Sequence, residues 1–127
     1  MRTTVTVLLM LGRLLGVLQI IGGVAIWVGM PPWVTQAHMG LGSLFVLVLW
    51  IVGVVALFAL PARALSLFTL LWGALVLWLG MAQMSILPGA AHWVIRVVHL
   101  LVGLIAIGLL EQVGKRVKGH WATIGDS

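Results

Sequence analysis

The chain has 127 residues, of which 63% are hydrophobic and 7% are charged, against roughly 45–50% and 25% in ordinary globular domains. This composition excludes a water-soluble domain, and the lack of cysteine excludes disulfides and thiolate metal ligands. The net charge of +5 does not indicate nucleic-acid binding, because Lys115, Arg116 and Lys118 cluster beside an apolar run, where anionic lipid headgroups are the usual partner.

Four apolar runs predict four transmembrane helices that form one all-α bundle over residues 1–127. In chain order the helices cover about residues 5–29, 38–60, 64–86 and 93–112, followed by a basic tail at 113–127. Each run approaches the roughly 20 residues needed to cross a bilayer core of about 30 Å, and each connection contains proline, which ends helices. The first run lacks a small-residue cleavage site, so we expect it to be retained.

Basic residues predict the orientation of the bundle. Arg2, Arg63 and the cluster at 115–118 fall on one side of the four runs, whereas the connections around Pro31 and Pro88 are almost uncharged. By the positive-inside rule, the basic side with both termini is cytoplasmic. We therefore expect a multi-pass protein of the bacterial inner (cytoplasmic) membrane, with the lipid bilayer as a partner and no nucleic-acid partner.

Two pairs of short motifs indicate a weak internal repeat of two helices. WVGM at 27–30 matches WLGM at 78–81, and HMGLG at 38–42 matches HLLVG at 99–103. Two helices per half give both halves the same orientation, so an axis along the membrane normal would relate them. The repeat predicts that His38 and His99 occupy equivalent positions.

Ionisable residues within membrane helices are costly and often mark function, and here they gather at the outer ends of the second and fourth runs. His38 lies on the second run. His92, Arg96 and His99 follow one another at i, i+4 and i+7, which places them on one face of the fourth helix. No Asp or Glu lies in the middle of a predicted helix, which argues against a proton-coupled exporter.

One imidazole from each of two facing helices is what a six-coordinate haem iron requires. We therefore predict that haem b is bound between the second and fourth helices, with His38 and His99 as axial ligands of the iron. Gly42 and Gly103, each one turn below a histidine, would leave room for the flat macrocycle.

The second axial ligand is open, because two arguments conflict. The repeat pairs His38 with His99, whereas distance along the helix from the cytoplasmic charges places His92 closer to the depth of His38. We prefer His99, with His92 as the alternative ligand or a propionate contact. Arg96 would meet the negatively charged propionates at the lipid–water boundary.

The segments AHMGLG at 37–42 and VHLLVG at 98–103 resemble one four-helix half of haem A synthase. The resemblance implies histidine ligands at the outer ends of the second and fourth helices, where His38 and His99 lie. This chain is a half-length unit and lacks the acidic residue that the family carries in the outer loop between its first two helices. The resemblance therefore supports haem b binding rather than haem A synthesis.

These observations favour a small b-type cytochrome-like subunit for electron transfer within a larger respiratory or photosynthetic membrane complex, with other membrane subunits as partners. The chain offers no pocket with an acid–base pair, so we do not expect an enzyme acting alone, although it would suit a subunit of a membrane oxidoreductase. Three alternatives stay open. They are a cofactor-free structural subunit, a subunit that binds bacteriochlorophyll through one histidine, and a transition-metal site at His38, His92 and His99.

Overall fold

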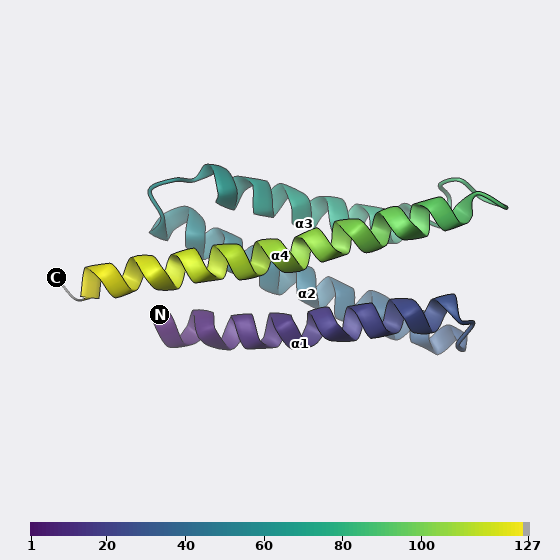
Figure 1. Cartoon of the computed structure of the whole chain (residues 1–127), viewed down its shortest axis with the longest axis horizontal. Helices are drawn as coiled ribbons and strands as arrows, with labels where there is room; N and C mark the ends of the chain where they lie inside the picture. Colours follow the sequence, from purple (N-terminus) through teal and green to yellow (C-terminus); the bar gives the residue numbers. More distant parts are fainter. Residues whose placement is uncertain (126–127) are drawn as a thin grey trace.

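The computed structural model describes residues 1–125 and contains four α-helices, with no strand in that range. The helices are α1 (Arg2–Trp27), α2 (Pro32–Ala59), α3 (Ala64–Ala82) and α4 (His92–Gly125). All four are long and apolar enough to cross a membrane, which confirms the predicted four-helix transmembrane bundle. Both termini lie at one end of the bundle, and we call the opposite end, with residues 28–31 and 83–91, the outer end (Figure 1).

The start of α2 and the end of α3 differ from the sequence prediction, each for a local reason. Helix α2 begins at Pro32 rather than residue 38, because proline lacks an N–H and has a φ angle suited to the first turn of a helix. Helix α3 ends at Ala82 rather than residue 86. The chain then turns through Leu87 and Gly89, whose φ angles are 47° and 88°, a region that right-handed helices do not use.

The predicted basic tail is helical over residues 113–125, since α4 continues to Gly125, while residues 126–127 lie outside the described part of the chain. Val113, Gly114 and Val117 on this extension are buried. Leu9 of α1 packs directly against Gly114. Contact with α1 therefore explains why the helix does not end at the membrane boundary that hydropathy suggested.

The bundle consists of two hairpins, α1–α2 and α3–α4. Helices α2 and α4 contact each other and both flanking helices, whereas α1 and α3 do not contact each other within residues 1–125, and Figure 1 shows them on opposite sides of the central pair. The buried core lies mostly in the half that carries the termini. Its largest members include Leu49 and Val52 of α2 and Leu110, Val113 and Val117 of α4.

Glycines allow α1 and α4 to approach closely in this half. A Cβ atom on Gly12 would overlap the side chain of Leu110, and a Cβ atom on Gly114 would overlap the side chain of Leu9. Each helix therefore offers a glycine to a leucine of the other. Small residues at such contacts are how membrane helices gain van der Waals packing when lipid and side chains are equally apolar.

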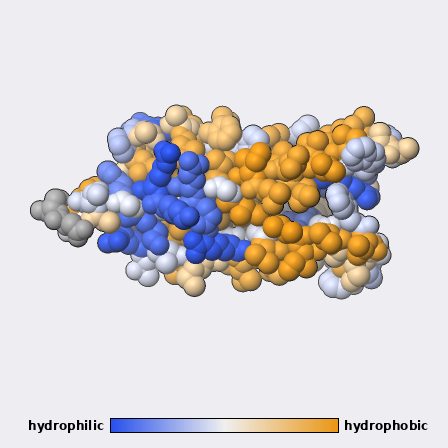
Figure 2. Space-filling model, in the orientation of Figure 1, coloured by the Kyte–Doolittle hydropathy of each residue, from blue (hydrophilic) through white to orange (hydrophobic). Residues whose placement is uncertain are grey.

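A charged contact also joins α1 to α4. The guanidinium of Arg13 donates two hydrogen bonds to the Glu111 carboxylate, from Nε to Oε1 and from Nη2 to Oε2, the second at 2.9 Å. Lys115 Nζ lies 3.9 Å from the same carboxylate. Figure 2 shows hydrophilic residues gathered toward the end that carries the termini and a hydrophobic band toward the outer end.

Candidate functional site

A cavity of about 350 Å³ lies in the outer half of the bundle and is lined by residues of all four helices. We call it the inner cavity. Its lining includes every residue that the sequence singled out for cofactor binding: His38, Gly42, His92, Arg96, His99 and Gly103. Figure 2 shows the surface hollowed toward the outer end. The tightly packed core and the inner cavity thus occupy opposite halves of the same four helices.

His38 of α2 and His99 of α4 face each other in the inner cavity. Their ring centroids are 6.3 Å apart and their planes are inclined by 69°. The Nδ1 atom of each ring is buried and has no hydrogen-bond partner, although buried polar atoms nearly always have one. Two half-buried imidazoles therefore face each other across one cavity, and each has a buried Nδ1 without a hydrogen-bond partner.

Each of these histidines packs against glycine in the other helix of its own hairpin. A Cβ atom on Gly22 of α1 would lie 3.0 Å from Nδ1 of His38, and one on Gly23 would lie 3.7 Å from its Cε1. A Cβ atom on Gly80 of α3 would lie 3.5 Å from Cε1 of His99. The two hairpins therefore hold their histidines in similar ways, which the sequence did not indicate.

The tryptophan motifs of the apparent repeat are not equivalent in the structure. Gly29 lies beyond the end of α1 with a φ angle of 83°, whereas Gly80 lies within α3. Only the histidine motifs face each other. The repeat therefore has a structural counterpart only at His38 and His99, and each of these rings packs against a glycine of the neighbouring helix.

The two predicted macrocycle glycines have different surroundings. A Cβ atom on Gly42 would lie 2.9 Å from Oε1 of Gln19, whereas one on Gly103 would meet nothing within 4 Å. The Nε2 atom of Gln19 donates a 2.9 Å hydrogen bond to the backbone carbonyl of His38. The space beside Gly42 is thus taken by Gln19, and open space remains beside Gly103. Sequence reasoning missed Gln19, whose signal was an amide within an apolar helix.

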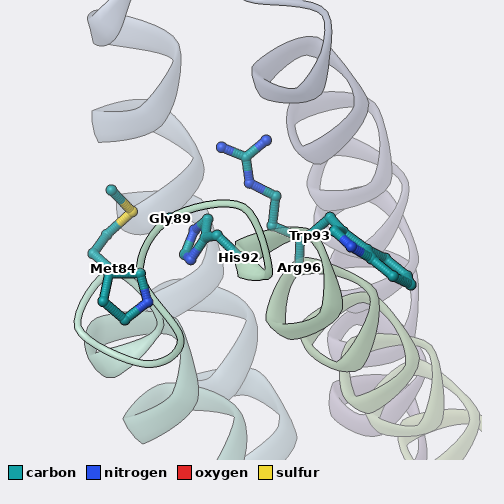
Figure 3. Close-up of a pocket in the computed structure, with 6 residues that line it drawn as sticks. Met84, Gly89, His92, Trp93 and Arg96 are labelled. Carbon is teal, nitrogen blue, oxygen red and sulfur yellow. The ribbon is translucent and has the colours of Figure 1, made fainter.

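His92 and Arg96 line a second space, which we call the outer pocket. It measures about 430 Å³ and is lined by Met84, Pro88, Gly89, His92, Trp93 and Arg96. In Figure 3, Met84 and Arg96 lie on either side of His92, and Trp93 points away from Met84. Nδ1 of His92 lies 3.4 Å from the carbonyl oxygen of Ile86. His92 therefore interacts with the α3–α4 connection, and the histidine of α4 that faces His38 is His99.

Arg96 has no acidic partner in the described residues. Glu111 is the one acidic residue among them, and Arg13 binds it in the other half of the bundle. Within residues 1–125, Arg96 itself makes no hydrogen bond or ion pair. Arg96 therefore carries a charge that no described residue neutralises, at a membrane boundary where a long side chain can reach lipid headgroups and water.

No protein-family model, curated protein or solved structure matches this chain. The resemblance to haem A synthase therefore stays a prediction. Any functional assignment rests on the geometry of the inner cavity and the outer pocket.

The three histidines do not gather into one metal-binding cluster. Within the described chain, no group of three or more His, Cys, Asp or Glu side chains is placed to hold a metal ion. A site built from protein side chains alone normally needs three or four such ligands. A haem iron needs only two from the protein, because the macrocycle supplies four nitrogens.

Proposed function

We propose that this protein is a small b-type cytochrome-like membrane subunit that binds haem b between α2 and α4 and transfers electrons within a larger membrane complex. The observation that carries the proposal is the 6.3 Å separation between the rings of His38 and His99. Imidazole nitrogen binds a first-row metal ion at about 2 Å, so two imidazoles on opposite sides of one ion have centroids roughly 6 Å apart. The two side chains therefore have the spacing that axial ligation requires.

Other residues of the inner cavity fit the same group. Gly103 borders open space, which suits a flat macrocycle, and Arg96 lines the cavity without a partner of its own. The acidic propionates of haem would supply the charge that Arg96 lacks, through charge-assisted hydrogen bonds. Gly22, Gly23 and Gly80 would fix the positions of the two imidazoles. A bound haem would supply reversible one-electron chemistry.

The facing histidines also favour this proposal over the pigment-binding and the cofactor-free alternatives. A bacteriochlorophyll bound through one histidine would use either His38 or His99 and leave the other ring without a partner. A cofactor-free structural subunit would leave two facing imidazoles in one cavity with no ligand between them. A ligand bound to both rings would give each of the two histidines a partner in this apolar cavity.

The direct test is a dithionite-reduced minus oxidised absorbance spectrum of the detergent-purified protein after addition of haem b. We expect a Soret band and an α-band that sharpens on reduction. Native protein with red or near-infrared bands would instead indicate the pigment-binding function. A featureless difference spectrum from folded protein, with haem remaining free in solution, would refute the cytochrome proposal.

Replacing Gly22 with alanine should weaken haem binding by about tenfold, which corresponds to about 1.4 kcal/mol. The new methyl group would lie 3.0 Å from Nδ1 of His38 and would displace the ring from its present position opposite His99. Gly40→Ala is the matched control, because a Cβ atom there would meet nothing within 4 Å and the gain in helix propensity is the same. Titration of each variant with haem, followed at the Soret band, measures the affinities. Equal affinities for the two variants would contradict the prediction.

A further inference from the structure

The outer pocket borders the inner cavity. The two spaces share Met84, His92 and Arg96, so a molecule in the outer pocket touches side chains that also line the inner cavity. The volume of about 430 Å³ lies within the usual range of small-molecule sites. The pocket lies where α3 ends and α4 begins, at the outer end of the bundle, and is therefore reached from the membrane boundary.

The contact of His92 with the α3–α4 connection favours hydrogen on one of its two ring nitrogens. A carbonyl oxygen can only accept a hydrogen bond, so the contact between Nδ1 and the Ile86 carbonyl at 3.4 Å requires the hydrogen on Nδ1. In a neutral imidazole, Nε2 is then an acceptor. The outer pocket thus offers a ligand one hydrogen-bond acceptor from His92.

Arg96 gives the same pocket hydrogen-bond donors. Its guanidinium carries five N–H groups and no acceptor, and none of them is used within residues 1–125. Met84 and Pro88 supply apolar contacts on the other side of His92, as Figure 3 shows for Met84. The pocket therefore matches a compact apolar ring that donates one hydrogen bond and accepts another.

We infer that the outer pocket binds the ring of a lipid-soluble hydroquinone, with one hydroxyl donating to Nε2 of His92 and an oxygen accepting from Arg96. A phenolic hydroxyl both donates and accepts, whereas a lipid phosphate would bind Arg96 but has no hydrogen for Nε2. This inference rests on the proposed cytochrome function, since a hydroquinone is a reductant. Its oxidation to the quinone releases two protons and two electrons. His92 would accept the proton of the hydroxyl that it binds and pass it to water, and the other hydroxyl would lose its proton to water. A bound ferric haem would take up the two electrons one at a time, and the partner complex would reoxidise it after each.

The test is titration calorimetry of tetramethylhydroquinone, kept reduced under argon, into the haem-free full chain in nanodiscs, with empty nanodiscs subtracted. His92→Phe should weaken binding about tenfold, because one hydrogen bond is lost while a ring is kept. His120→Phe, at the opposite end of α4, is the matched control and should change affinity less than twofold. The dimethyl ether of the same compound, which has no hydroxyl hydrogen, should bind wild-type protein about tenfold more weakly than the hydroquinone.

The ether comparison needs no variant, so the inference can be refuted even if His92→Phe fails to fold. No binding to wild-type protein, equal affinity for the ether, or equal affinity of a folded His92→Phe variant would each overturn it. Displacement of the hydroquinone by phosphatidylglycerol would assign the pocket to lipid phosphate and would also overturn it. A b-type spectrum without hydroquinone binding rejects the pocket alone, whereas hydroquinone binding without a b-type spectrum rejects the cytochrome alone.

Discussion

We expect His38→Ala and His99→Ala each to abolish the b-type difference spectrum of the haem-loaded protein, and His92→Ala and His120→Ala to retain it. The reason is that the proposed function makes the two facing rings the axial ligand pair, and each alanine would remove one ligand. Loss of residues that only support a metal ligand costs 10–100-fold in affinity, so loss of a ligand should lower haem affinity by more than about 100-fold. Difference spectra and haem titrations of the four variants provide the measurement.

Added imidazole separates the loss of a ligand from the loss of the fold. In a folded His38→Ala or His99→Ala variant, free imidazole fits the space of the missing ring and should restore the b-type spectrum. Unfolded protein would not recover it. A spectrum that survives in His99→Ala and disappears in His92→Ala would assign the second axial position to His92 and would contradict the pairing described above.

Hydropathy was sufficient to predict the number of helices, but not where α4 ends. The apolar runs identify α1 to α4 because each backbone group must be paired within the membrane, which a helix achieves locally. The extension of α4 beyond residue 112 depends on Val113 and Val117 being buried and on contact between Leu9 and Gly114. Leu9 and Gly114 are far apart in the chain, so no local pattern reveals their contact.

The histidine motif indicated which residue faces His38 better than helix depth did. Counting residues from the cytoplasmic charges favoured His92, but that count assumes that helix ends align. His92 is the first residue of α4, and its ring interacts with the carbonyl of Ile86. His99, two turns further into the bundle, is the residue whose ring faces His38. The motif succeeded because it compared positions within the helices rather than distances from their ends.

The residues that surround the facing histidines were beyond sequence reasoning. Gln19 donates a hydrogen bond to the carbonyl of His38, and Gly80 packs against His99. Neither residue stands at a helical spacing from a histidine that would have indicated the contact.

The pairing of Arg13 with Glu111 was also hidden from the sequence, because the two residues are separated by 98 positions. This pairing bears on the candidate site, since it occupies the one described acid and leaves Arg96 without an acidic partner in residues 1–125. Long-range contacts therefore determine which charged side chains near the candidate site have no partner within the chain.

The two halves of the bundle differ in packing: one is tightly packed and the other holds the inner cavity. In the half that carries the termini, α1 and α4 meet through glycine and leucine, with the Arg13–Glu111 pair beside them. In the outer half, the same helices line the inner cavity. An open site between four helices is tolerated because the packed half already fixes their relative positions. Substitutions in the packed half should therefore change stability more than those that face lipid.

Gly114→Leu should prevent stable folding, whereas Gly108→Leu in the same helix should be tolerated. A Cβ atom on Gly114 would overlap the side chain of Leu9, but one on Gly108 would meet nothing within 4 Å. Overpacking a well-filled core usually costs about 1–3 kcal/mol, and a whole leucine side chain between two helices in direct contact should cost at least the upper value. Unfolding in detergent with increasing SDS, followed by circular dichroism, measures the difference. If both variants unfold at the wild-type SDS concentration, the close α1–α4 contact does not hold the hairpins together, and the inner cavity must owe its shape to another part of the bundle.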